Sequence, residues 1–454
     1  MSTRRFIEYT QDQDFLLPPS LLEWLPKAHL AHFVSDVLDV FDLSEWERAY
    51  ATDNGSGAPP FPPRMMLKIL VYGYATGVFS SRKLESKCLE DIAFMYLAGM
   101  HHPDFRSIIK FRKRHLARFN DLFVQIVLLA RESGLASLGR VGIDGSKFKA
   151  NASKHKAMSY QHMCEQEEKL KAEIAEILRR AAETDETEDK KHGDYNGYSL
   201  PDALSFRQGR LDTIQAAKAR IEERARERAE LESERREEEA QAREAAGEKP
   251  KKYRKEPDST PKSKEQENFT DPESRIMRDG ATKGFVQGYN TQVAVDSEHQ
   301  IIVAATLNNQ ASDSQQLVPV IEAVKETAGA YPDEAMADAG YKSEANFATL
   351  ESDAYTTNAY VACGRETYDP RAVCPEGPLP ETASATERMG RKLKTEEGRA
   401  IYKTRKHVVE PVFGWIKNVL GFRQFSLRGQ ENAEAEWKLV CGAMNLRRMA
   451  RIMG

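Results

Sequence analysis

The chain contains little cysteine and no long apolar run. Its 454 residues include five scattered cysteines, and no two of them form a Cys-x-x-Cys pair. Cysteines so few, and odd in number, supply neither a disulfide framework nor the ligand spacing of a standard zinc site. They indicate a reducing setting. No stretch approaches the roughly 18 apolar residues of a membrane span, and Met1–Glu8 lacks the apolar core of a signal peptide. We therefore expect a cytoplasmic protein without a membrane partner.

An excess of positive charge is also absent. The chain has 66 basic and 70 acidic side chains and a formal net charge of −4, which at first argues against a nucleic-acid partner. The distribution of the charges removes that argument. Residues Ile221–Pro250 alone contribute −4, so the rest of the chain sums to zero, and its cations gather at Arg106–Arg118 and Arg391–Arg423. The whole-chain figure averages an acidic segment with two basic ones.

Aromatic residues are missing from Arg207 to Lys252, and 18 of the 30 residues in Ile221–Pro250 are charged. Such a segment cannot form a core. Ion pairs four residues apart can instead support it as a long solvated helix or a coiled-coil arm.

Strand and helix signals divide the chain into four zones. Apolar residues recur at helical intervals in the first zone, for example at Leu21, Leu25 and Phe33, and predict an all-α domain. Strand patterns at Val141–Ile143 and Tyr289–Val295, followed by alternating helices and strands, predict an α/β domain with a mixed sheet. The predicted zones are an N-terminal helical domain (1–136), an α/β domain (137–155 and 281–425), a charged helical insertion with a flexible linker (156–280) and a C-terminal helix (426–454).

Two aspartates follow predicted strands. Asp144 ends a short strand in Gly-Ile-Asp-Gly-Ser, and Asp338 ends another in Ala-Asp-Ala-Gly-Tyr. A carboxylate at the carboxyl end of a buried strand points into the crevice where α/β sheets bind ligands. Taken singly, each fits a turn aspartate that merely ends a strand better than a catalytic one. Asp296 is a further carboxylate at a strand end, but a hairpin turn explains it at least as well, and we leave it out of the site.

Glu410 lies in a basic region, since Arg391–Gln424 holds nine basic residues and three acidic ones. Pro411 is favoured in the first turn of a helix, so we expect the helix to begin near Val408–Pro411, with Lys417 two turns later on nearly the same face. The glutamate could be only a salt-bridge partner, or it could be a metal ligand whose basic neighbours hold phosphates. Three carboxylates on separate elements beside a basic helix are what two-metal phosphoryl transfer requires.

The three carboxylates are surrounded by Gly-Ile-Asp-Gly-Ser, Gly-Tyr-Asn-Thr-Gln-Val-Ala-Val-Asp, Ala-Asp-Ala-Gly-Tyr and Val-Glu-Pro-Val-Phe-Gly-Trp-Ile-Lys. Together these motifs resemble bacterial insertion-sequence transposases of the DDE type. The resemblance covers essentially the whole chain, including Leu-Leu-Pro-Pro-Ser-Leu near the N-terminus, Ala-Met-Asn-Leu-Arg-Arg-Met in the tail and a charged helical insertion after the first strand. It implies a ribonuclease-H-like mixed sheet with flanking helices, in which Asp144, Asp338 and Glu410 bind two Mg²⁺ ions, with Mn²⁺ as a substitute.

Such transposases often carry a Tyr, Arg, Glu, Lys signature with two, three and six residues between successive members. Glu410 and Lys417 fit this spacing, and so do Tyr402 and Arg405, but four residues separate Arg405 from Glu410. The strict spacing would instead select two lysines, Lys403 and Lys406. The resemblance assigns Glu410 to the metal site and Lys417 to DNA, and we add Arg405 as a further DNA-binding residue.

A basic stripe predicts a DNA-binding helix in the N-terminal domain. Within Asp104–Phe119 the cations recur every fourth residue, apolar residues fall on the opposite face, and no acid interrupts Phe105–Phe119. A charge run is usually an ordinary solvated face, but the absence of acids favours a helix that lies on phosphates or enters a major groove. The cations are Arg106, Lys110, Arg114 and Arg118, and the apolar residues are Phe105, Ile109, Leu116 and Phe119.

The leading hypothesis is a DNA transposase that binds the terminal inverted repeats of its own element, cleaves a strand with Mg²⁺ and transfers the 3′-OH into target DNA. Its partners would be double-stranded DNA, at transposon ends and target, and at least one further copy of the chain, because two ends must be brought together. We expect it in the bacterial cytoplasm, at the nucleoid. The alternatives are a ribonuclease-H-like nuclease without strand transfer and a non-catalytic DNA-binding protein derived from a transposase.

Overall fold

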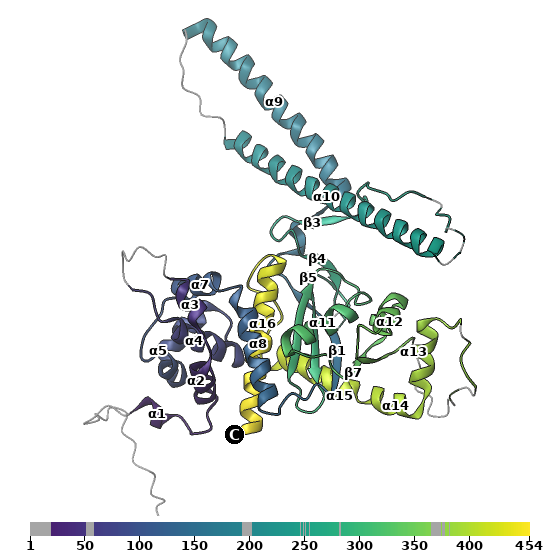
Figure 1. Ribbon diagram of the computed structural model, residues 1–454. Helices are drawn as coiled ribbons and strands as arrows, with labels where there is room; N and C mark the ends of the chain where they lie inside the picture. The colour runs from purple at the N-terminus through teal and green to yellow at the C-terminus, as the bar shows by residue number, and fades with distance from the viewer. Residues whose placement is uncertain are drawn as a thin grey trace, which may run out of the picture.

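The computed structural model consists of a layer of helices, a central sheet with flanking helices, and a helical hairpin that projects from one end of the sheet (Figure 1). The structure describes residues 20–50, 59–192, 202–245, 247, 249, 251–253, 255–280, 283–364, 374, 377–380 and 382–454. The Leu16–Pro19 part of the N-terminal motif lies outside these residues. Across the described ranges, no helix is long and apolar enough to cross a membrane, and the five cysteines are free.

The N-terminal region is helical, as predicted, but it does not have a core of its own. Its buried apolar side chains are continuous with those of the sheet, because α8 packs against the C-terminal helix. Pro63 occupies the first turn of its helix, where the missing N–H leaves no hydrogen bond unmade. The helices are α1 (Leu21–Trp24), α2 (Leu30–Val40), α3 (Ser44–Arg48), α4 (Pro63–Ala75), α5 (Ser81–Glu90), α6 (Ile92–Leu97), α7 (Phe105–Arg114) and α8 (Arg118–Glu132).

A six-stranded mixed sheet lies at the centre of the molecule. The long strand β5 pairs antiparallel with β1 on one side and with β4 and β6 on the other, and β7 and β8 then continue the sheet in parallel from β1. The predicted α/β fold class is confirmed, and this arrangement is consistent with a ribonuclease-H-like domain. The strands are β1 (Arg140–Lys149), β4 (Arg275–Arg278), β5 (Phe285–Asp296), β6 (Ile302–Asn308), β7 (Glu334–Ala337) and β8 (Asn358–Val361).

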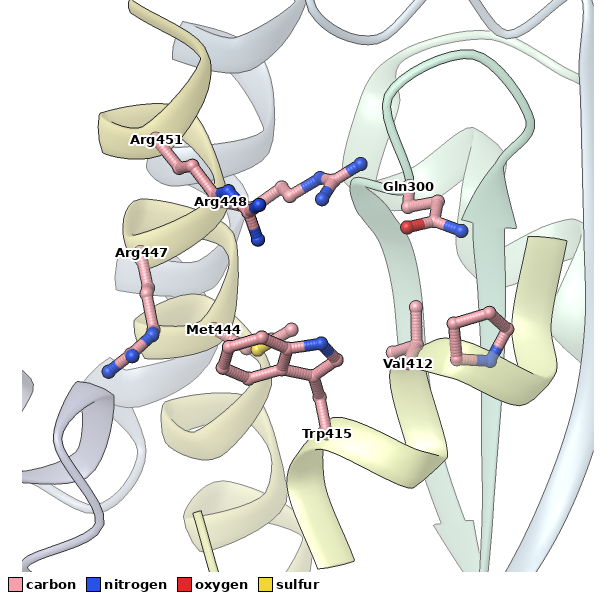
Figure 2. Close-up of a pocket in the computed structure, with 8 residues that line it drawn as sticks. Gln300, Val412, Trp415, Met444, Arg447, Arg448 and Arg451 are labelled. Atoms are coloured by element: carbon pink, nitrogen blue, oxygen red, sulfur yellow. The ribbon is translucent and has the colours of Figure 1, made fainter. Parts of the chain in front are cut away.

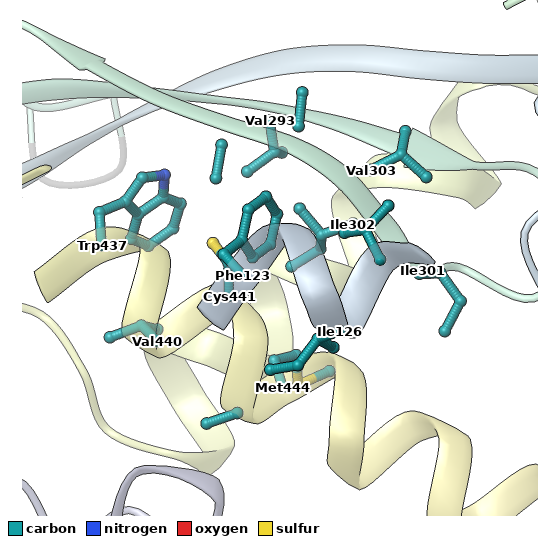
Figure 3. Close-up of a cluster of buried hydrophobic side chains, with 14 of the residues drawn as sticks. Phe123, Ile126, Val293, Ile301, Ile302, Val303, Trp437, Val440, Cys441 and Met444 are labelled. Carbon is teal, nitrogen blue, oxygen red and sulfur yellow. The ribbon is translucent and has the colours of Figure 1, made fainter. Parts of the chain in front are cut away.

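Helices flank the sheet, and the C-terminal one joins it to the N-terminal layer. Figure 3 shows Phe123 and Ile126 of α8, Trp437 and Cys441 of α16, and Val293 of β5 in one apolar cluster. The flanking elements are α11 (Leu317–Ala328), a 3₁₀ turn η2 (Ala339–Tyr341), α12 (Glu344–Leu350), α13 (Ala385–Lys394), α14 (Glu396–Lys403), α15 (Arg405–Gly414), a π-helical turn η3 (Trp415–Val419) and α16 (Gln430–Met453).

The charged insertion forms the predicted helical arm. Its helices α9 (Tyr160–His192) and α10 (Asp202–Ala245) run side by side away from the sheet (Figure 1). A narrow apolar seam that includes Met163, Leu170 and Ile214 joins the two helices. The short strands β2 (Ala157–Ser159) and β3 (Gln266–Asn268) pair at the base of the arm, where the buried Glu267 carboxylate forms ion pairs with two arginines of α10, Arg220 and Arg224.

Three local expectations are wrong. The strand β1 does not end at Asp144 but continues to Lys149, because β5 pairs with it along that length. The helix α15 begins at Arg405 rather than near Val408, and Pro411 lies inside it. The boundary expected at residue 280 falls within the sheet, since β4 forms a hairpin with β5.

Asn445 supports a test of how α16 is attached to the sheet. Its buried side chain accepts a hydrogen bond from the Ile302 N–H at 2.8 Å and donates one to the Ile302 carbonyl at 2.8 Å. The partner strand has a register shift at this point, between Ala294 and Val295. The amide therefore satisfies backbone groups that the irregular ladder leaves free.

We expect Asn445→Leu to lower the free energy of unfolding by about 2–5 kcal/mol, because it buries both Ile302 groups without partners. Urea denaturation followed by circular dichroism measures this. Asn432→Leu, on the same helix but partly exposed, is the matched control. Equal effects of the two substitutions would contradict the assigned role of Asn445.

Candidate active site

The parallel pairing of β1 with β7 brings the two predicted aspartates together. Gly142 of β1 pairs with Met336 of β7, and continuing this register by two residues places Asp144 beside Asp338. Asp144 accepts a hydrogen bond from the Gly145 N–H at 2.8 Å, and Asp338 accepts one from the Gly340 N–H at 2.8 Å. Each carboxylate is thus oriented by the N–H of a glycine that follows it in the chain, one residue later for Asp144 and two residues later for Asp338.

Helix α15 carries the third carboxylate and lies directly on β1. A Cβ atom at Gly142 would stand 2.5 Å from the Val409 side chain, so only glycine permits this approach. The proline inside the helix leaves the His407 carbonyl without its backbone donor. Gln300 replaces that donor, since its side-chain amide donates to the His407 carbonyl at 2.9 Å. Glu410 itself is largely exposed, at 56% of its side-chain surface.

Arg405 connects the helix carboxylate with the first strand carboxylate. Its guanidinium is 9% exposed and lies 3.9 Å from Asp144 Oδ2 and 4.0 Å from Glu410 Oε1. Both separations are too long for hydrogen bonds, and Nη1 has no hydrogen-bond partner among the described residues. The structure therefore brings Asp144, Asp338, Glu410 and Arg405 to one place, with a buried donor directed at the site.

The electrostatics of Asp144 are unfavourable for a carboxylate. Burial raises the pKa of Asp144 to about 6, and the neighbouring Asp338 and Asp313 carboxylates add to the rise. The Gly145 N–H and the Arg405 guanidinium oppose it without cancelling it. A cation bound beside Asp144 would therefore stabilise the ionised form of this carboxylate.

Lys417 lies in the π-helical turn η3, whereas the expected face assumed regular α-helical spacing from Glu410. Its ammonium donates to Ser146 Oγ at 2.6 Å and to the Lys147 carbonyl at 3.0 Å, and it stands 4.5 Å from the centre of the Phe148 ring. Burial lowers the pKa of the Lys417 ammonium. The lysine is thus fixed on β1, two residues beyond Asp144.

Phe413, Trp415 and Asp296 have structural roles. Phe413 is buried and stacks on Trp437 with ring centres 6.3 Å apart, and Trp415 packs against the core beneath the Arg447 guanidinium. Asp296 is fully buried and accepts hydrogen bonds from the backbone N–H groups of Glu298 and His299 at 3.0 and 2.9 Å. These hydrogen bonds are those of a hairpin-turn aspartate.

Asp313 is a residue that the sequence reasoning missed. It lies between β6 and α11, where it accepts hydrogen bonds from the side-chain amides of Asn290 and Gln292 at 2.7 Å each and from Lys147 at 3.3 Å. Its loop sequence, Gln-Ala-Ser-Asp-Ser, places the aspartate five residues after the end of β6 and not directly at a strand end. The alternating polar residues of β5 were the available signal, because a strand that buries Asn290 and Gln292 must supply them with partners.

The donor set fits a divalent cation in its chemistry, since carboxylate oxygens are the ligands that Mg²⁺ prefers. The side chains are nevertheless not arranged around a common centre. Among the described residues, no three carboxylate, histidine or cysteine side chains converge closely enough to hold a metal ion. Arg405 lies between Asp144 and Glu410, and its charge partly offsets theirs.

The basic stripe of the N-terminal region is only partly as predicted. Arg106, Lys110 and Arg114 are exposed on α7, but Arg118 begins the next helix and is half-buried. The predicted apolar face is only partly right: Phe119 is buried and Leu116 packs on the core, but α7 itself buries Ile108, Phe111 and Arg112 while Ile109 is 37% exposed. The stripe is therefore three cations long, and a Tyr50 ring lies 4.4 Å from the Arg114 guanidinium.

Two further basic surfaces were not predicted. A groove of about 450 Å³ lies between α5, α7 and the start of the C-terminal segment, and its exposed cations are Arg82 and Lys113. Figure 2 shows a smaller pocket between α15 and α16, where Arg448 and Arg451 face Gln300 above the Trp415 ring. Both surfaces include residues from the C-terminal part of the chain, after the sheet, and so extend beyond the α7 stripe.

Two aspartates on or directly after neighbouring strands, a helix glutamate and buried cations are residue types that metal-dependent phosphoryl transfer uses. Comparison with known families agrees. Residues 19–114 match a Transposase domain (DUF772), and residues 257–446 match a Transposase DDE domain. The chain belongs to the DDE transposases, enzymes that transfer phosphoryl groups, typically with divalent metals, and bind DNA. No curated protein and no solved structure matches it.

The two family matches bear unequally on the site. Asp338 and Glu410 lie within the matched DDE range, whereas Asp144 lies outside both ranges. The place of Asp144 beside Asp338 therefore rests on the strand pairing and on the shared electrostatics.

The raised pKa of Asp144 predicts a stability change with a definite sign. Because the folded-state pKa of about 6 exceeds the ordinary value of 3.8, folding favours the protonated acid. Stability is then fully retained below about pH 4 and falls as the pH rises toward 6. In metal-free buffer at pH 7.5, Asp144→Asn should raise the free energy of unfolding by about 2–3 kcal/mol.

Thermal unfolding in EDTA at pH 7.5 and at pH 4 measures this difference, which should vanish at the lower pH. Asp353→Asn, at an exposed carboxylate, is the control and should change little at either pH. An Asp144→Asn protein that is less stable than the parent at pH 7.5 would contradict the assigned electrostatics.

Proposed function

We propose that this protein is an insertion-sequence transposase that binds the terminal inverted repeats of its element, cleaves a DNA strand there and joins the 3′-OH to target DNA. One observation carries the proposal. Asp144 of β1 and Asp338, directly after the parallel strand β7, are close enough for their charges to interact, and the buried Arg405 lies near both Asp144 and Glu410 of α15. The membership in the DDE transposases supports the same reaction class.

The carboxylates Asp144, Asp338 and Glu410 would hold two Mg²⁺ ions, with Mn²⁺ as a substitute. When bound, such ions supply activation of the attacking oxygen and stabilisation of the leaving oxygen. The protein's own contribution is placement. The pairing of β1 with β7 fixes the two aspartates, and the close contact at Gly142 fixes the helix that carries Glu410.

Arg405 and Lys417 would bind the phosphate beside the scissile bond. Arg405 is buried and has a free donor at Nη1, and its fork of N–H groups matches phosphate oxygens. Lys417 is held on β1 by Ser146 and by the Lys147 carbonyl, which restricts its ammonium to one side of the site. Orienting a phosphodiester in this way restricts attack to one direction.

The cations Arg106, Lys110, Arg114 and Arg118 would contact the DNA of the transposon end, together with the groove cations Arg82 and Lys113. Contacts from arginine and lysine to phosphates orient a protein on duplex DNA without reading its sequence. Two ends must meet for transposition, so we infer that the active form is a homodimer or a higher oligomer that works at the bacterial nucleoid.

Asp144→Ala or Asp338→Ala should reduce strand cleavage by at least about a thousandfold, because each removes a carboxylate from the reacting centre. Binding to the terminal repeat should stay within about twofold of the parent protein, since neither side chain lies in the basic surfaces. Nicking assays and mobility shifts on a labelled end duplex with Mg²⁺ measure both quantities. Asp353→Ala is the control for an exposed carboxylate.

Equal losses of binding and cleavage would count against these roles. The same reactions separate the alternatives. Joined donor–target products exclude a nuclease without strand transfer, and Mg²⁺-dependent nicking excludes a protein that only binds DNA.

Lys110→Ala should weaken binding to all duplexes to a similar degree and lower the slope of log affinity against log salt by about one. The reason is that an exposed lysine on α7 releases roughly one counterion when it contacts a phosphate. Fluorescence anisotropy at several salt concentrations measures the slope. Arg388→Ala removes an exposed arginine that pairs with Glu351 and should leave the slope unchanged. An unaltered slope for Lys110→Ala would remove α7 from the interface.

A further inference from the structure

Asp313 lies near both of the segments that carry the aspartates. A Cβ atom added to Gly145, which follows Asp144, would lie 2.9 Å from Asp313 Oδ1. A Cβ atom added to Gly340, two residues after Asp338, would lie 3.7 Å from Asp313 Oδ2. The same carboxylate therefore lies near the backbone beside both aspartates, and the glycine in Asp144-Gly145 makes room for it.

Asp313 approaches β1 from the face opposite α15. Successive strand residues point to opposite faces. Asp144 and Ser146 contact Arg405 and Lys417, whereas Gly145 and Lys147 face Asp313. The carboxylate thus lies behind Asp144 and supports the strand instead of joining the reacting centre.

A chain of hydrogen bonds runs from Asp313 to the turn that follows Asp338. Gln292 donates to Asp313 Oδ1 at 2.7 Å through its amide nitrogen. The amide oxygen of the same side chain accepts a hydrogen bond from the buried Tyr341 hydroxyl. Tyr341 is the last residue of η2, the turn that Asp338 caps. Gln292 also pairs directly with Gly145 across the β1–β5 ladder.

A second connection ties the Asp313 loop to the same turn. The Asn346 amide of α12 donates to the Ser314 carbonyl at 2.7 Å and to the Tyr341 carbonyl at 3.3 Å. Ser314 is the neighbour of Asp313, so the loop is attached to η2 at Asp313 and at the residue that follows it.

We propose that Asp313 is a positioning residue that sets the separation of Asp144 and Asp338 and thereby their joint affinity for divalent cations. This inference rests on the proposed function, which places metal ions between those carboxylates. Lys147 and two amides already bind Asp313, so its oxygens are engaged in orientation. Partners that orient metal ligands without touching the metal typically contribute 10–100-fold to metal affinity.

The test measures Mn²⁺ binding to the DNA-free protein by electron paramagnetic resonance, and strand cleavage against Mn²⁺ concentration. Asp313→Asn should weaken Mn²⁺ binding by about tenfold or more, raise the Mn²⁺ concentration needed for cleavage and leave binding to the end duplex within about twofold. Tyr341→Phe removes only the hydroxyl at the far end of the chain and should act in the same direction. The double variant should be no worse than Asp313→Asn alone, because both substitutions break one chain.

Asp296→Asn is the matched control, since this buried aspartate binds backbone N–H groups at the other end of β5. It should lower stability without altering Mn²⁺ affinity. Unchanged Mn²⁺ affinity in both Asp313→Asn and Tyr341→Phe would overturn the inference. Loss of one bound ion in Asp313→Asn with no effect of Tyr341→Phe would also overturn it, because Asp313 would then be a ligand.

Failure of the proposed function would look different. If Asp144→Ala left Mn²⁺ binding intact, the assignment of the metal site itself would be wrong. If Asp144→Ala abolished Mn²⁺ binding while Asp313→Asn left it unchanged, only the role of Asp313 would fail.

Discussion

The contact between α15 and β1 at Gly142 is the constraint on which the site depends. Asp144 lies two residues along the strand and Glu410 next to Val409 on the helix, so their separation follows from how closely these elements approach. The absent side chain at Gly142 permits that approach, and Gln300 keeps the helix regular where Pro411 would break it. On the other face of the strand, Gly145 admits the Asp313 carboxylate. Two glycines of one strand thus allow the site to be held from both sides.

Much of the fold could be predicted from the sequence because its signals are local. Alternating residues in Phe285–Asp296, the charged stretch of the arm and the helical repeats before residue 136 each encode their element in neighbouring residues. The errors arose where tertiary contacts decide. β1 extends beyond Asp144 because β5 pairs with it, and α15 includes Pro411 because a distant glutamine satisfies the freed carbonyl. Neither contact can be inferred from the residues next to Asp144 or Pro411 in the sequence.

The carboxylates of the candidate site could be predicted from the sequence, but the residues that position them could not. Asp144, Asp338 and Glu410 stand in recognisable motifs, whereas Asp313 stands in an ordinary polar loop and acquires its place through Asn290 and Gln292. Arg405 departs from the expected spacing, yet the structure places it between two of the three carboxylates. Spacing counted along a helix presumes regular α-helical turns, and the π-helical turn at Trp415–Val419 breaks that premise for Lys417.

A buried network joins α7 to the C-terminal helix α16. Arg112 of α7 donates to the Tyr74 hydroxyl at 3.0 Å and to Ser426 at 2.9 Å, and Tyr74 donates to the fully buried Glu436 of α16 at 2.8 Å. Removing one partner from such a network leaves an uncompensated charge and typically costs about 3–5 kcal/mol. Because α16 also packs on the sheet that carries Asp144, α7 is connected to strand β1 by packed elements rather than by a linker. The shared core therefore holds the exposed cations of α7 and the three carboxylates in one frame.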